Sequence, residues 1–460
     1  MFPNSKKSSS NYRVLKKRYT DKLLDLLYDE KLSPAFFNST QLAEQYKLEK
    51  KWLTLKQLFV KLDKEICLEI GISILKKAKN NDSLFLQFQI LNEIVYHIGL
   101  FHRTNKKYRE LLIEYKTVSS HIRLDQKLTL LYVELAKAVV NSNPYILSSS
   151  IENLSKRVFK LWHKSKDIDN YFIKFKLYNS LYFIYLIKNN TVRSKEVAKK
   201  AIKYFECKSG FSPIALFQFH QKLGISYLLL KDFDKAKSSF NFCFNYNPKK
   251  GSISWLYNFN YLFLTNILEN DFIESMKIIS MVINNYDFKK LEVRFRAPWY
   301  LKEAFIHFLI KTGKLAPEES PDHKLRAFRL SRFKNDVSRF NKDKRGLNIT
   351  INIIEFLFLL IEGKHDKMLD KLQSLKQYGY KYLKKDEYTR PFTFIKLLLQ
   401  IPEGNFEPEL IRKKAARYQK ILEENPLDYS EHAISIEIIP YEILWEEILS
   451  SLERSTAKTV

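Results

Sequence analysis

Residues 220–248 read HQKLGISYLLLKDFDKAKSSFNFCFNYNP and are the most informative segment of the chain. Its apolar residues recur three and four positions apart on both sides of a polar break at Lys231 and Asp232. That spacing places apolar side chains on one face of a helix. The segment therefore predicts two amphipathic helices joined by a tight turn.

The same segment resembles a tetratricopeptide repeat (TPR). The family signature is Trp-x2-Leu-Gly-x2-Tyr, then Ala-x3-Phe, a further small residue and Pro. His220 stands at the Trp position and Cys243 at the second small position, and both depart from the pattern. The matching residues are Leu223, Gly224, Tyr227, Ala236, Phe240 and Pro248. The resemblance implies a TPR-like repeat at about 217–250.

Physical reasons for these residue types follow from helix packing. Gly224, Ala236 and Cys243 are expected where the two helices approach most closely, because a larger side chain would push the axes apart. Tyr227 and Phe240 are expected to fill the wedge towards the next hairpin. Pro248 is expected to end the second helix, since it cannot donate the next helical hydrogen bond.

The rest of the chain repeats the hairpin rhythm without the glycine and proline positions. Apolar residues keep three- and four-residue spacing almost throughout, and short polar breaks separate the runs. Further hairpins are predicted at about 84–118, 171–206 and 352–383. The β-branched runs 347–354 and 434–439 are interpreted as helix starts. We therefore expect an all-α fold, an α-solenoid of stacked antiparallel helix hairpins.

Changes of composition predict the domain organisation. We expect a disordered basic tail, a helical-repeat array, a polar connector carrying a basic helix, C-terminal hairpins with a cap, and a short tail. The corresponding ranges are 1–11, 12–312, 313–346, 347–454 and 455–460.

Charge indicates the kind of partner without identifying it. The 460 residues include 78 Lys and Arg against 51 Asp and Glu, a formal net charge of +27. Such a chain attracts nucleic acid, anionic membrane or acidic proteins. An A/T-rich coding sequence would produce a similar lysine-rich composition without selection for a ligand. Both explanations stay open.

Other composition features favour a reducing compartment. Cys67, Cys207 and Cys243 are odd in number, far apart, and outside any CxxC pattern that would hold zinc. The N-terminal residues carry charge without the apolar core of a leader peptide, and no apolar run of about 18 residues occurs. We expect a cytoplasmic protein without membrane contact, metal ion, cofactor or small-molecule substrate.

Catalytic motifs are scarce, so we expect no enzymatic activity. The sequence contains no GxGxxG, GxxxxGK[ST], GxSxG or HExxH pattern. Arg157 and His163 have the spacing of the RxxxxxH motif of HEPN-type ribonucleases, but a chain with this many Arg and His residues produces about one such match by chance. Residues 41–53 have the outline of a helix-turn-helix, with Lys47 where the turn glycine is usual.

The basic segment 324–345 is the favoured functional candidate. Arg326, Arg329 and Arg332 recur every third residue, which on a helix would form one ridge able to bind phosphate or carboxylate. The competing interpretation is a solvated face of a connector helix. Lys222 and Asn258 are further candidates, as positions on inner helices.

The predicted function is that of a non-catalytic adaptor or scaffold. The first helices of stacked hairpins would form a concave groove that binds a protein or peptide, acidic if Lys and Arg gather there. The alternative is a basic helical-repeat protein that binds nucleic acid or assists a nuclease complex. The aromatic residues between 240 and 261 are interpreted as core between consecutive hairpins.

Overall fold

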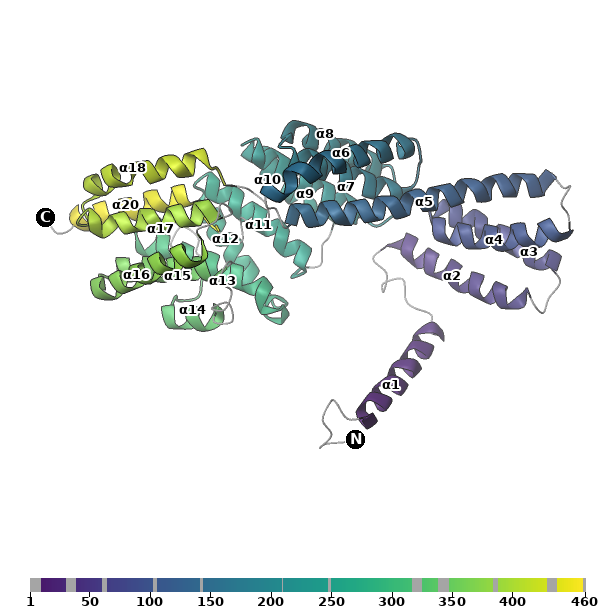
Figure 1. The fold of residues 1–460 in the computed structure, drawn as a ribbon. Coiled ribbons are helices and arrows are strands. Elements are labelled where there is room, and N and C mark those ends of the chain that lie inside the picture. The colour runs from purple at the N-terminus through teal and green to yellow at the C-terminus, as the bar shows by residue number, and fades with distance from the viewer. Residues whose placement is uncertain are drawn as a thin grey trace. The chain divides into compact units, whose positions relative to one another are not determined.

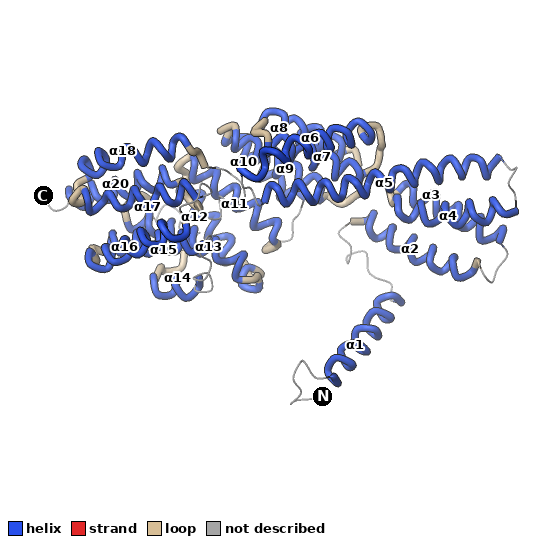
Figure 2. Tube along the Cα trace, viewed as in Figure 1, coloured by secondary structure: helices blue, strands red, loops and turns tan. Residues whose placement is uncertain are grey.

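A computed structural model describes residues 10–29, 39–59, 64–101, 106–140, 144–208, 210–246, 250–316, 325–337, 347–383, 388–427 and 437–457. Within these ranges every regular element is a helix and none is a strand (Figure 1, Figure 2). The all-α prediction is confirmed. Each helix from α6 to α13, and again from α15 to α18, packs against the next one along the chain.

The helices have the following bounds: α1 Ser10–Asp29, α2 Thr40–Leu58, α3 Lys64–Asn80, α4 Leu84–Phe101, α5 Lys106–Val140, α6 Pro144–Ser165, α7 Tyr171–Ile187, α8 Thr191–Glu206, α9 Ile214–Leu229, α10 Phe233–Cys243, η2 Phe244–Tyr246, α11 Ile253–Leu268, α12 Phe272–Ile283, η3 Phe288–Lys290, α13 Val293–Lys311, α14 Leu330–Val337, α15 Leu347–Ile361, α16 His365–Tyr382, α17 Thr389–Glu403, α18 Pro408–Glu424 and α20 Tyr441–Ala457.

The chain divides into two compact units. Unit 1 consists of residues 1–124 and 207–213, and unit 2 of residues 125–206 and 214–460. Unit 1 has its own apolar core, centred on α2, α3 and α4. Unit 2 has a smaller core among α5, α6, α7 and α8 and a larger one that runs from Leu228 to Leu452. The connector predicted at 313–346 therefore does not separate two cores, because α13 and α15 pack against each other across it.

Several of the described hairpins share one kind of turn, in which the first helix ends at a residue in the left-handed conformation. At Asn189, Lys231 and Asn270 the φ angles are 52°, 58° and 59°. The following N–H then reaches back to the carbonyl five residues earlier, as from Asp232 to Tyr227 at 3.0 Å. This Schellman pattern satisfies carbonyls that a helix end leaves unpaired. It recurs with positive φ at Asp82, Gly313, Gly363 and Asn405.

A side-chain cap starts the second helix in several of these hairpins. The carboxylates of Asp232 and Asp271 accept hydrogen bonds from the backbone N–H groups of Lys235 and Glu274, at 3.4 and 3.1 Å. An oxygen at this position pairs an N–H group for which the helix has no partner. Turn and cap together explain why polar pairs in the sequence indicate the hairpin positions.

The hairpin predicted at 217–250 is present as α9 and α10. Gly224 lies where the helices meet, since a Cβ atom built there would stand 2.5 Å from Cε1 of Phe240. Ala236, Phe240 and Cys243 are fully buried, and Leu223 and Tyr227 are partly buried. Pro248 lies outside the described residues. Hairpins also occupy the predicted ranges 171–206 and 352–383, as α7–α8 and α15–α16. The predicted range 84–118 falls on α4 and the first part of α5, which continues to Val140.

In part of unit 2 the first helices of the hairpins are more buried than several of the second helices. Most residues of α11, α13 and α15 are buried, and they lie on all faces of these helices. Helices α10, α16 and α18 bury only one face. The first helices α11, α13 and α15 are therefore the interior of this part of unit 2. Their side chains are not presented as an open groove.

Several predicted boundaries need correction. The run 347–354 begins α15, as predicted. Residues 437–439, the described part of the run 434–439, are not helical, and α20 starts at Tyr441. The basic helix predicted at 325–333 is wrong in its first half, because residues 325–329 are not helical and α14 begins at Leu330. Helix α1 begins at Ser10, inside the predicted tail 1–11, and α20 continues to Ala457, inside the predicted tail 455–460.

Candidate anion-binding pocket

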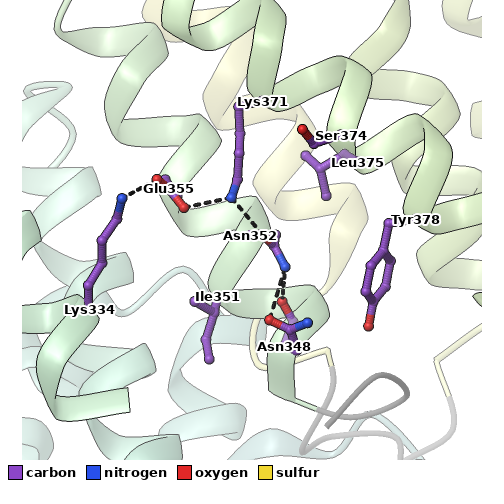
Figure 3. Close-up of a pocket in the computed structure, with 9 residues that line it drawn as sticks. All are labelled: Lys334, Asn348, Ile351, Asn352, Glu355, Lys371, Ser374, Leu375 and Tyr378. Atoms are coloured by element: carbon purple, nitrogen blue, oxygen red, sulfur yellow. Dashed lines mark hydrogen bonds and ion pairs between the residues drawn. The ribbon is translucent and has the colours of Figure 1, made fainter. Parts of the chain in front are cut away.

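A polar pocket lies in unit 2 between α14, α15 and α16, with a volume of about 410 Å³ (Figure 3). Helix α15 is almost wholly apolar, yet Asn348, Asn352 and Glu355 interrupt it at i, i+4 and i+7. That spacing puts all three on one helix face. Helix α16 faces them with Lys371, Ser374, Leu375 and Tyr378, α14 contributes Lys334, and Ile351 completes the lining.

Hydrogen bonds join the charged side chains of the pocket into one network. The Lys371 ammonium donates to Oε2 of Glu355 and to Oδ1 of Asn352, both at 2.6 Å. Lys334 donates to the other oxygen of Glu355. Nδ2 of Asn352 in turn donates to the backbone oxygen of Asn348 at 2.6 Å. Figure 3 shows the two lysines approaching Glu355 from opposite sides.

The Glu355 carboxyl is held in its charged form. Burial raises the pKa of this group, but the hydrogen bonds from Lys334 and Lys371 lower it by more, so the net pKa lies below that of an ordinary glutamate. At neutral pH the network consists of two ammonium groups and one carboxylate. The network therefore has a net charge of one positive unit.

This arrangement can bind a small anionic group. An ammonium group has three N–H bonds. Within the described residues Lys334 uses one of them and Lys371 two, so each ammonium retains a donor for an incoming oxygen. Ile351 and Leu375 add apolar surface beside the charge. A carboxylate with an adjacent aliphatic group matches this combination.

Arg326, predicted to bind an external anion, pairs with acids of its own chain. Its guanidinium donates to both oxygens of Glu303 at 2.8–3.0 Å and to Asp336 at 3.0 Å. It also lies 4.8 Å from the ring centroid of Tyr300. The Glu303 side chain is only 4% exposed, so the arginine neutralises a buried charge.

The predicted arginine ridge is wrong because residues 325–329 are not helical. Arg329 is exposed, whereas Arg332 is half-buried and donates to the carbonyl of Ala327. Phe328, next to Arg329, stacks on Phe358 of α15, with ring centroids 4.3 Å apart. The segment therefore lies over α13 and α15 as part of the fold, and the three arginines do not form one surface.

Lys222 and Asn258 lie on first helices, as predicted, but they make internal contacts. The Lys222 ammonium is 5.3–5.8 Å from the ring centroids of Tyr182, Phe183 and Phe219. Asn258 is fully buried, and its amide donates to the backbone oxygen of Phe240 at 2.8 Å. Asn258 therefore joins consecutive hairpins and is not accessible to a partner.

The remaining sequence candidates are placed as follows. Arg157 and His163 are exposed on α6, and Arg157 pairs with Glu134 at 2.8 Å. Residues 41–53 belong to the single continuous helix α2, which excludes the helix-turn-helix outline. The aromatic residues between 240 and 261 include packed pairs between hairpins, such as Phe240 and Tyr261 with centroids 5.6 Å apart.

Neither metal-binding clusters nor membrane-spanning helices are found in the part of the chain that the structure describes. No group of three or more His, Cys, Asp or Glu side chains there could hold a metal ion. None of the helices in these ranges combines the length and the apolar character needed to cross a bilayer.

Comparison with protein-family models, with curated proteins and with solved structures finds no match to this chain. The pocket itself was missed by the sequence interpretation. A signal did exist, namely the polar residues Asn348, Asn352 and Glu355 on one face of an otherwise apolar helix. The contributions of Lys334 and Lys371 could not be found this way, since they come from other helices.

Proposed function

We propose that this chain is a non-catalytic adaptor that binds an acidic peptide segment of a partner protein. The stacked hairpins form an α-solenoid resembling TPR proteins, and the pocket between α14, α15 and α16 holds one carboxylate of the partner. The carrying observation is the pair of lysines, Lys334 and Lys371, that share the single carboxylate of Glu355 within a cavity.

The charge of the pocket supports an anionic ligand. Lys371 is only 16% exposed and Glu355 19%, so their interaction is screened less than that of surface pairs. A ligand carboxylate would interact with both ammonium groups while Glu355 remains ionised. Asn348 and Tyr378 are polar groups at the same opening and would orient it (Figure 3).

A direct test uses a fluorescently labelled peptide of alternating Glu and Leu, with its Gln and Leu counterpart as the reference. Lys371→Gln and Lys334→Gln should each weaken binding of the acidic peptide by about 10-fold, as expected for one charge-assisted hydrogen bond. Glu355→Gln should strengthen it, because the competing carboxylate is removed. Lys413→Gln on the exposed face of α18 removes the same charge elsewhere and should leave affinity unchanged.

Two results would contradict the proposal. Equal weakening by Lys413→Gln and Lys371→Gln would mean that net charge alone attracts the peptide. Binding of RNA that competes with the acidic peptide and is lost in the pocket variants would instead favour the nucleic-acid alternative.

A further inference from the structure

Helix α1 carries an apolar stripe that nothing in the described structure covers. Leu15, Tyr19 and Leu23 follow one another at i, i+4 and i+8, which aligns them on one face. Their exposed fractions are 44%, 70% and 44%. No other described helix packs closely against α1, although the predicted array 12–312 includes it.

An exposed stripe of this kind needs a partner, since most helices in proteins are stabilised by packing an amphipathic face. Helices α2 and α3 of the same unit illustrate the difference. They bury Trp52, Leu55, Ile74 and Leu75 in a shared core. Because its stripe is not packed, α1 lacks the burial of apolar side chains that stabilises α2 and α3.

Positive charge is concentrated before this helix and in the part of it up to Lys22, whereas its last turns carry Asp25 and Asp29. Between residues 6 and 22 the only acidic residue is Asp21, whereas the basic residues are Lys6, Lys7, Arg13, Lys16, Lys17, Arg18 and Lys22. With 3.6 residues per turn, Lys16 and Lys22 flank the stripe on opposite edges, and Asp21 lies on the back of the helix. Long cationic side chains at the edges can reach an anionic layer while the stripe is buried.

We propose that α1 binds the surface of an anionic lipid bilayer, lying in the interface with Leu15, Tyr19 and Leu23 towards the acyl chains. A bilayer supplies an apolar layer bordered by negative headgroups, which is the complement of a stripe edged by lysines. Nucleic acid would engage the cations but leave the stripe exposed. This inference is independent of the pocket, goes beyond the proposed adaptor function and replaces the expectation from the sequence that the chain makes no membrane contact.

The test uses the full chain and sedimentation with vesicles of phosphatidylcholine alone or with a third of phosphatidylserine. The charge variant combines Lys16→Gln, Lys17→Gln, Arg18→Gln and Lys22→Gln. The stripe variant combines Leu15→Gln and Leu23→Gln. A matched control removes four exposed cations of α18 by Lys413→Gln, Lys414→Gln, Arg417→Gln and Lys420→Gln. None of the substituted α1 residues belongs to a core, so folding is expected to be unchanged.

The unchanged chain should sediment with the anionic vesicles, less so at high salt, and not with phosphatidylcholine alone. The charge variant should partition about 100-fold more weakly. The stripe variant should also lose most binding, and the α18 control should keep it. Retained binding in the stripe variant, or equal loss in the α18 control, would overturn the proposal. The proposal would also be overturned if the unchanged chain did not bind the anionic vesicles but bound RNA or an acidic peptide through α1.

Discussion

Gly224 has no room for a side chain, because the Phe240 ring occupies the position where its Cβ atom would be. Gly224→Ala should therefore lower the free energy of unfolding by about 1–3 kcal/mol, the usual effect of overpacking. The gain in helix propensity, up to about 1 kcal/mol, opposes this loss without cancelling it. Denaturant unfolding monitored by circular dichroism would measure the change.

A double-mutant cycle separates the steric effect from other causes. In a Phe240→Leu background the overlap is relieved, so the Gly224→Ala step should become neutral or slightly stabilising. An unchanged loss in both backgrounds would show that Phe240 does not restrict Gly224.

Lys302 is a buried cation whose charge is costly to the fold. It is 2% exposed and lies 5.0 Å from the ring centroid of Trp299 and 5.5 Å from that of Phe263. Burial lowers the pKa of its ammonium to about 7. Between pH 7 and the unfolded value near 10.5 the unfolded chain binds more protons at this residue, so its contribution to stability rises with pH.

Lys302→Met should accordingly raise the free energy of unfolding at pH 7 by about 1–3 kcal/mol, because an apolar chain of similar length replaces a desolvated charge. The advantage over the unchanged protein should shrink as the pH is raised from 7 to 10. Thermal unfolding at matched pH values would check both statements. A constant difference across that range would indicate that Lys302 keeps its charge in the fold.

Residue-level prediction from the sequence succeeded where the contact was local to one hairpin. Gly224, Ala236 and Phe240 lie within a single helix pair, and their spacing was enough to place them together. Arg326 was misinterpreted because Glu303 and Asp336 meet it only in the folded chain. A run of arginines in sequence carries no information about such partners.

At the scale of the element, the left-handed turn residues make a further prediction. Lys231 has a φ of 58°, which an L-amino acid adopts at a cost and glycine does not. Lys231→Gly should raise the free energy of unfolding by about 0.5–1 kcal/mol. Lys188→Gly is the matched control, because Lys188 lies at another hairpin turn with a φ of −79°. There the same change should destabilise the protein. Stabilisation by both substitutions, or by neither, would contradict the turn geometry.

Helix positions were largely predictable for the same local reason. In each of these hairpins the polar residues that form the turn and the helix cap are adjacent in sequence. The hairpins at 171–206 and 217–250 could therefore be found from the sequence. Residues 325–329 could not be predicted, because their apolar and basic pattern fits a helix. Their backbone is not helical, and Phe328 packs against Phe358. Tertiary packing decided the local structure there.

At the scale of the whole molecule, the separate cores of the two units predict separate unfolding. Leu91 is fully buried in the core of unit 1, and Leu357 is fully buried in the large core of unit 2. Replacing either by alanine leaves a cavity that should cost about 2–5 kcal/mol. Because no buried residue is shared between these two cores, each loss should be confined to its own unit.

Hydrogen–deuterium exchange resolved by peptide would measure this. Leu91→Ala should accelerate exchange in α3 and α4 while peptides from α11, α13 and α15 exchange as before, and Leu357→Ala should produce the reverse pattern. Thermal unfolding of the unchanged chain should accordingly depart from a single two-state transition. If Leu91→Ala accelerated exchange equally in all five helices, the two cores would unfold as one cooperative body, and the division at residue 124 would have no energetic meaning.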